Sequence, residues 1–335
     1  MRKFFGRIIC VFLYAYIFLL FLGHVGKGNF FYSDIVDEKL SVMLEKYKNK
    51  VDIIVAGDSR AWNQVIPQVI DERTGLTAIS IAAPSYHLPG IYNHLKKRKM
   101  LDKQYILLIS ISTLSINDGI ITEGYLPYYF ISYMSWRDRC TTFGGCFSPT
   151  LRDTYFHYFI LRGPHEIFMT RFLAARDILF KVRKGTMNDD IFLWRGFMPL
   201  DQEPKKDPLD LELAMYPRNG RLDGIKWKVY QKNIEALSKS KCQILFFQPP
   251  LAPIAKSRAY IRDSEQQLKE LMKDEAAKYK NIHFIDFYNN AKTEKMLPNE
   301  LYADGMHVNH KGAEVFTNLL VDKLFERGLL TKKEK

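Results

Sequence analysis

Several features that would direct this chain toward nucleic acid or metal chemistry are missing. It has no zinc-finger spacing, no aromatic RNP-like motif and no arginine-rich arm, which argues against a nucleic-acid partner despite the net charge of +12. Only four of its 335 residues are cysteines, and no CxxC pair suggests zinc. Nothing in the sequence implies a cofactor. The positive charge instead suits an anionic membrane surface or an acidic polymer.

The four cysteines are compatible with an extracytoplasmic chain but do not require one. Cys140 and Cys146 bracket the short segment "TTFGG", so they either close a disulfide in an oxidising compartment or remain thiols. Cys10 lies in an apolar N-terminal run. Cys242 begins a predicted buried strand, where a cysteine acts as a small apolar residue.

The N-terminus combines positive charge with a long apolar run. "MRKFFGR" carries three cations, and residues 8–26 contain no charge, a length that suits a membrane span. A cleaved signal peptide would have a shorter apolar stretch and an Ala-x-Ala-like site, neither of which is evident. We therefore expect an uncleaved transmembrane signal anchor at 1–26 and a connecting helix at 27–50. The positive flank predicts a single-pass protein of a bacterial-type cell membrane, with residues after 27 outside the cytoplasm.

Strands and helices alternate along most of the remaining chain. The predicted strands are 51–56, 77–82, 104–112, 242–248 and 281–287, and the predicted helices are 64–73, 88–101, 224–240, 264–280 and 310–328. Connections of this kind predict right-handed crossovers between parallel strands. The expected fold is a three-layer α/β/α sandwich with a five-stranded parallel sheet, preceded by one transmembrane helix.

Residues 113–223 interrupt the alternation. They are rich in aromatic residues and lack a clear βα repeat, so we interpret them as an insertion, helical and loop-rich, within a domain spanning 51–335. Aromatic stripes are usually core, but an insertion at the carboxyl end of a parallel sheet is also placed to cover an active site.

The residues "GDSR" (57–60) follow the first strand and allow two interpretations. In the first, Gly57 supplies backbone freedom and Asp58 or Ser59 caps the next helix. In the second, Ser59 is a nucleophile at the carboxyl end of the strand, where open α/β sheets bind their ligands.

A second polar group, "DGMHVNH" (304–310), precedes the last helix. Asp304 and His307 are three residues apart, so the carboxylate can orient the imidazole and leave Nε2 free to accept a proton from a serine hydroxyl. His310 is a competing base. These three side chains are also conceivable metal ligands, although one carboxylate and no separate ligand group do not favour a metal.

The two motifs together resemble those of the SGNH (GDSL-like) hydrolase superfamily. "GDS" after the first strand matches its first block, and "DGMHVNHKGAEVF" is similar to its last block. The match covers 51–112 and 224–328. It implies that Ser59 is the nucleophile, His307 the base and Asp304 the residue that orients the base. No GxSxG elbow is present, which disfavours the ordinary α/β-hydrolase fold.

The chain also departs from the pattern of that superfamily. Arg60 stands where leucine is usual. The second block has no glycine to donate to an oxyanion and offers Ala83 or Ser85 instead, and "SIND" makes Asn117 a candidate side-chain donor. An Asn-Asp turn is the alternative role for Asn117.

An anchored domain of this type most resembles the cell-envelope members of the superfamily, DltD-like and alginate-acetylation-like proteins. The resemblance implies a serine-dependent acyl-esterase or O-acyltransferase acting on an envelope polysaccharide or related polymer through an acyl-serine intermediate. Its partners would be the polymer or an acyl donor, and a membrane-bound O-acyltransferase. The alternative is a catalytically weak binding or assembly subunit that keeps the fold.

Overall fold

The computed structural model describes five single residues near the N-terminus and four continuous segments: Tyr14, Met43, Lys46, Tyr47, Lys50, 51–83, 86–117, 195–200 and 222–330. Apart from Tyr14, all of them belong to one compact unit formed by residues 35–133 and 188–335.

Five parallel strands form the centre of the unit. They are β1 (Ile53–Ala56), β2 (Ala78–Ser80), β3 (Ile106–Ser110), β4 (Gln243–Gln248) and β5 (Ile282–Asp286). Their order in the sheet is β2-β1-β3-β4-β5. The four buried residues of β1 form a continuous apolar run, as expected for a strand covered on both faces. The predicted five-stranded parallel sheet is confirmed, with strands a few residues shorter than predicted.

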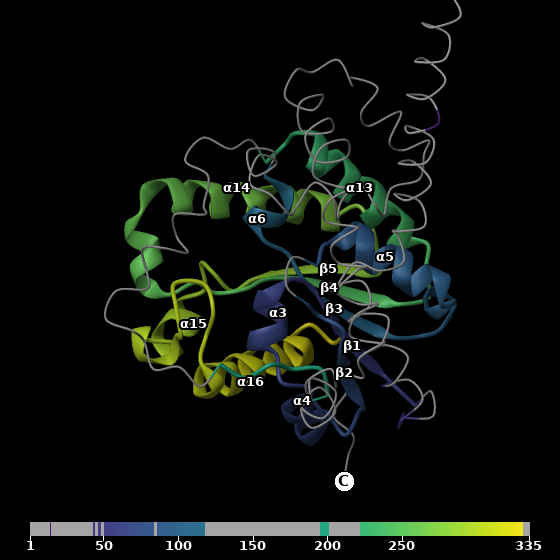
Figure 1. Ribbon diagram of the computed structural model, residues 1–335, viewed down its shortest axis with the longest axis horizontal. Coiled ribbons are helices and arrows are strands. Elements are labelled where there is room, and N and C mark those ends of the chain that lie inside the picture. The colour runs from purple at the N-terminus through teal and green to yellow at the C-terminus, as the bar shows by residue number, and fades with distance from the viewer. Residues whose placement is uncertain are drawn as a thin grey trace, which may run out of the picture. The chain divides into compact units, whose positions relative to one another are not determined.

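Helices cover both faces of this sheet, which gives the predicted three layers (Figure 1). One layer contains α3 (Ser59–Gln64), α4 (Pro67–Thr74), α15 (Ala291–Met296) and α16 (His310–Glu326). The other contains α5 (Leu88–Lys97), α6 (Thr113–Ile116), α13 (Ile225–Ser238) and α14 (Ala259–Ala276). Short 3-10 turns lie at Met100–Asp102, Pro253–Ser257 and Asn299–Leu301.

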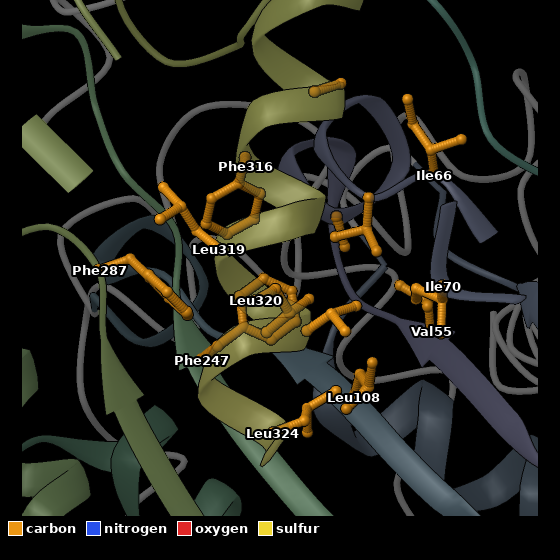
Figure 2. Packing of buried hydrophobic residues seen from close by; sticks show 14 of the residues in the cluster. Val55, Ile66, Ile70, Leu108, Phe247, Phe287, Phe316, Leu319, Leu320 and Leu324 are labelled. Carbon is orange, nitrogen blue, oxygen red and sulfur yellow. The ribbon is translucent and has the colours of Figure 1, made fainter. Parts of the chain in front are cut away.

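The apolar face of α16 packs directly on the sheet (Figure 2). Phe316 is fully buried, with its ring centroid 5.0 Å from that of Phe287 and 6.1 Å from that of Phe247. Leu320 and Leu324 continue the same face at helical spacing. Burial of a large aromatic side chain contributes on the order of 2–3 kcal/mol, so this contact fixes α16, and the loop before it, against the strands.

Several helix boundaries differ from the sequence prediction; the helix predicted at 88–101, for example, ends at Lys97. The helix predicted at 64–73 begins at Pro67 as α4, and Gln64 instead ends α3, because Pro67 disfavours a helical conformation for Ile66, which is extended (φ −95°, ψ 108°). Gly75 ends α4 with its backbone in the left-handed region (φ 70°, ψ 10°). The helix predicted at 264–280 begins five residues earlier, at Ala259, and ends at Ala276, so the Ser264 hydroxyl lies inside it and donates to the Tyr260 carbonyl.

Several expectations fall outside the described residues. They are the anchor at 1–26 except Tyr14, most of the connecting helix at 27–50, most of the insertion at 113–223, the cysteines Cys140 and Cys146, and Ser85. In the part of the chain that is described, no helix is long and apolar enough to cross a membrane.

Candidate active site

The turn after β1 presents Ser59 at the edge of the sheet. Gly57 has φ +137°, and a Cβ there would lie 2.0 Å from the Ser110 hydroxyl oxygen, so only glycine fits this turn. The Asp58 carboxylate caps α3 by accepting the Arg60 N–H at 3.1 Å. Ser59 is the first residue of the helix and remains partly exposed. The capping interpretation of "GDSR" therefore holds for Asp58 and leaves the Ser59 hydroxyl free for other contacts.

A second loop, residues 302–309, brings Asp304 and His307 to the same edge. An antiparallel bridge between Tyr302 and Val308 closes the loop. Within it the Asp304 carboxylate accepts the backbone N–H groups of Met306 and His307, each at 2.7 Å. These bonds fix the carboxylate in the loop before it makes any side-chain contact.

The three side chains form one continuous chain of hydrogen bonds. His307 Nδ1 lies 2.8 Å from Asp304 Oδ2 and 3.0 Å from Oδ1. His307 Nε2 lies 2.8 Å from Ser59 Oγ, across 248 residues of sequence. The side chains of His307 and Asp304 are 12% and 16% exposed, so the pair is shielded but not sealed from solvent. The structure thus brings together the three residues that the sequence motifs pointed to.

His310 makes different contacts from His307. It is the first residue of α16, its N–H donates to the Leu200 carbonyl, and its ring makes an edge contact with Phe197. The hydrogen bond to Ser59 is made by His307. The geometry therefore favours His307 over His310 as the base.

Arg60 forms a buried ion pair with Asp58, the residue before the serine. Its Nε lies 3.8 Å from Asp58 Oδ2, and the side chain is only 2% exposed. Burial alone would raise the pKa of Asp58, but the Arg60 charge and hydrogen bonds from Ser112 and Ser110 outweigh it and lower that pKa. Arg60, which stands in place of the usual leucine, therefore supplies a charge that keeps the buried Asp58, the residue before the serine, ionised.

His87 is a buried histidine that the sequence reasoning did not single out. It precedes α5 and is 6% exposed. Its pKa is lowered to about 4, because burial and the nearby Lys226 charge outweigh the opposing charge of Asp58. His87 is therefore neutral at pH 7. A single histidine outside any motif carried no signal of this in the sequence.

The three candidate oxyanion donors have different outcomes. Ser85 lies outside the described residues. The Ala83 N–H donates to the Gly57 carbonyl at 3.2 Å and is therefore already used within the fold. Asn117 directly follows α6, the short helix after β3, and is fully buried. Its backbone N–H donates to Thr113, and its carbonyl accepts Lys226 Nζ at 2.7 Å. Its role as a donor to an oxyanion stays a prediction.

A short segment, 195–200, supports the site from within the predicted insertion. The Met198 N–H donates to the Trp62 carbonyl, and its own carbonyl accepts Asn63 Nδ2 at 2.7 Å, so the segment is bonded to α3. Gly196 has φ +88°, and a Cβ there would lie 2.0 Å from the Ser80 carbonyl oxygen. Nothing in the local sequence distinguishes these residues from the aromatic-rich stretch before them.

Among the described residues no group of three or more His, Cys, Asp or Glu side chains is arranged to hold a metal ion. Asp304 and His307 instead bond to each other and to Ser59. Cys242, which directly precedes β4, is a buried free cysteine whose pKa is raised by burial.

Comparison with known proteins gives a limited result. No protein-family model matches the chain, and no curated protein matches it. Among solved structures it is similar to a lipase/acylhydrolase from Enterococcus faecalis, with 12% identity over 85% of this chain and 100% of the other, and a TM-score of 0.39. We draw no functional inference from a likeness of this extent.

Proposed function

We propose that the protein is a serine-dependent acyl-esterase or O-acyltransferase of the SGNH (GDSL-like) type. The observation that carries the proposal is the continuous contact Ser59–His307–Asp304, assembled from two loops at the carboxyl edge of the sheet. A serine hydroxyl 2.8 Å from an imidazole that a carboxylate orients is the arrangement used for nucleophilic acyl transfer.

In the first half-reaction, Ser59 Oγ attacks the ester carbonyl carbon as its proton passes to His307 Nε2. Asp304 accepts a hydrogen bond from Nδ1–H, which holds the tautomer and stabilises the imidazolium that forms. The tetrahedral intermediate then collapses, the C–O bond to the alcohol breaks, and His307 returns the proton to the leaving oxygen. An acyl-serine remains.

In the second half-reaction, His307 accepts a proton from water or from an acceptor hydroxyl, whose oxygen attacks the acyl-serine. The tetrahedral intermediate then collapses, the bond between the acyl carbon and Ser59 Oγ breaks, and His307 returns the proton to Ser59 Oγ, which restores the free serine. Water gives hydrolysis, and a sugar hydroxyl gives transfer. The backbone N–H of Ser59 has no acceptor within α3, because it belongs to the first residue of the helix. We propose it as an oxyanion donor, together with the Asn117 amide and Ser85.

We further propose a cell-envelope substrate, an acylated polysaccharide or related polymer. Support comes from the sequence: the cation-flanked apolar run at 8–26 suits a single-pass anchor that leaves the catalytic domain extracytoplasmic. The net charge of +12 suits an acidic polymer, and a membrane-bound O-acyltransferase would be the corresponding partner.

Retention of the full-length protein in membranes through an alkaline wash tests the anchor, and a mature form that begins after residue 26 would contradict it.

Turnover of a small activated ester such as 4-nitrophenyl acetate tests the chemistry. We expect Ser59→Ala to abolish turnover and His307→Ala to cost nearly as much, since members of such a triad act as a unit. His310→Ala is the matched control, because its ring contacts Phe197, and it should change the rate only mildly.

Two outcomes would overturn the proposal. If His310→Ala is inactive while His307→Ala keeps its activity, the assignment of His307 as the base is wrong. A folded wild-type protein without any serine-dependent turnover would favour the alternative, a binding or assembly subunit that keeps the fold.

A further inference from the structure

Gln64 joins the helix that carries Ser59 to the loop that carries His307. It is the last residue of α3, five positions after the serine, and it is fully buried. Its Nε2 donates to the carbonyl of Met306 at 2.8 Å, across 242 residues of sequence. Met306 directly precedes His307, so the bond holds the loop one residue away from the base.

The placement of Gln64 is costly for folding. Its Oε1 is buried and has no hydrogen-bond partner among the described residues. A buried amide oxygen without a partner loses its hydration and gains nothing in return. An apolar side chain of similar length would fill the same space without this cost. The amide is therefore not explained by packing alone.

Hydrogen bonds on both sides of Gln64 attach its neighbouring segments to the rest of the fold. The Thr317 hydroxyl donates to the Ala313 carbonyl within α16 and accepts the Ile66 N–H at 3.0 Å, which attaches the residues after α3 to that helix. On the other side of the loop, the Ala252 N–H donates to the Gly305 carbonyl at 3.1 Å. Gln64 thus completes a frame that holds the loop between α3 and the segment after β4.

We propose that Gln64 is a positioning residue, whose hydrogen bond to the Met306 carbonyl sets the distance between Ser59 Oγ and His307 Nε2. This inference rests on the proposed serine chemistry. Ser59 and His307 come from separate segments, and their contact at 2.8 Å depends on how those segments are held together. A displacement of about 1 Å at such a contact can lower a rate on the order of 100-fold.

The test compares labelling rates of the full-length protein with a fluorophosphonate probe, which reacts with an activated serine. Gln64→Met removes the donor and the unpartnered oxygen while keeping the length of the side chain. Gln64→Glu keeps size and polarity but gives the carboxylate no N–H to donate. The matched control is Thr74→Val at the end of α4, which removes the hydroxyl that donates to the Ile70 carbonyl and accepts the Leu76 N–H.

We expect both Gln64 variants to be labelled about 10–100-fold more slowly than wild type, while Thr74→Val keeps the wild-type rate. The pKa that governs labelling should not move, because Asp304 and His307 remain paired within one loop. A structural role alone would lower the denaturation midpoint of a Gln64 variant without slowing the labelling of its folded fraction.

The failures of the two proposals are distinguishable. If wild-type protein is labelled at Ser59 and the folded Gln64→Met variant is labelled equally fast, the positioning role is wrong and the serine chemistry stands. Equal slowing in Thr74→Val would also overturn it, because general destabilisation would then explain the loss. Folded wild-type protein that is never labelled would overturn the serine chemistry and the positioning role with it.

Discussion

Acidification should destabilise the protein through His87. This histidine is buried beside α5, and its Nε2 has no hydrogen-bond partner within the described part of the chain. Burial, the Lys226 charge and the opposing Asp58 charge together lower its pKa to about 4. In the unfolded chain the same imidazole would titrate at about 6.5.

The sign and size follow from linkage. Between pH 6.5 and 4 the unfolded chain binds a proton that the folded chain does not, so the free energy of unfolding falls as the pH falls through this window. A difference of about 2.5 pKa units at 1.36 kcal/mol per unit gives a loss of about 3 kcal/mol by pH 4. Asp58 contributes in a different window: its pKa is lowered, so its contribution is lost only below about pH 4.

Denaturant unfolding at a series of pH values measures this loss. We expect the wild-type free energy of unfolding to drop between pH 6.5 and 4 by about 3 kcal/mol more than that of His87→Phe, which keeps a buried ring but cannot be protonated. If the free energies of unfolding of the two proteins change in parallel across that window, the reasoning is refuted, and His87 must be accessible to water in the folded protein.

Three other substitutions give distinct outcomes. Asp304→Asn should leave the fold intact and lower ester turnover by on the order of 10⁴ at most, because the imidazole of His307 can then adopt the wrong tautomer; unchanged kcat would contradict this. Gly57→Ala should abolish turnover or folding, since its Cβ would meet the Ser110 hydroxyl oxygen at 2.0 Å, and circular dichroism with an ester assay separates the two. Phe316→Ala should cost about 3–5 kcal/mol in denaturant unfolding, with the aromatic contacts on the sheet lost; a smaller loss would mean that the core closes around the cavity.

The sheet was predictable from sequence because each strand is a short apolar run between helical segments. β4, for example, is buried along five of its six residues and stops before two prolines. Helix starts were less predictable. Ser264 resembles a helix N-cap in the sequence, yet α14 begins five residues before it, at Ala259.

The catalytic candidates were predictable because two local motifs contain them. Asp304 and His307 are only three residues apart, and Ser59 follows a strand directly. The residues that hold these candidates in place were not predictable, because their contacts join positions far apart along the chain. Gln64 meets Met306 across 242 residues, and a glutamine at the end of a six-residue helix carries no local signal of such a contact.

Mapping the fluorophosphonate adduct on the folded, full-length protein tests the central claim most directly. We expect peptide mass spectrometry to find one adduct per chain, on Ser59, and none in His307→Ala under the same conditions. An adduct on any other residue, or a folded wild-type protein that stays unmodified, would contradict the assignment of Ser59 as an activated nucleophile.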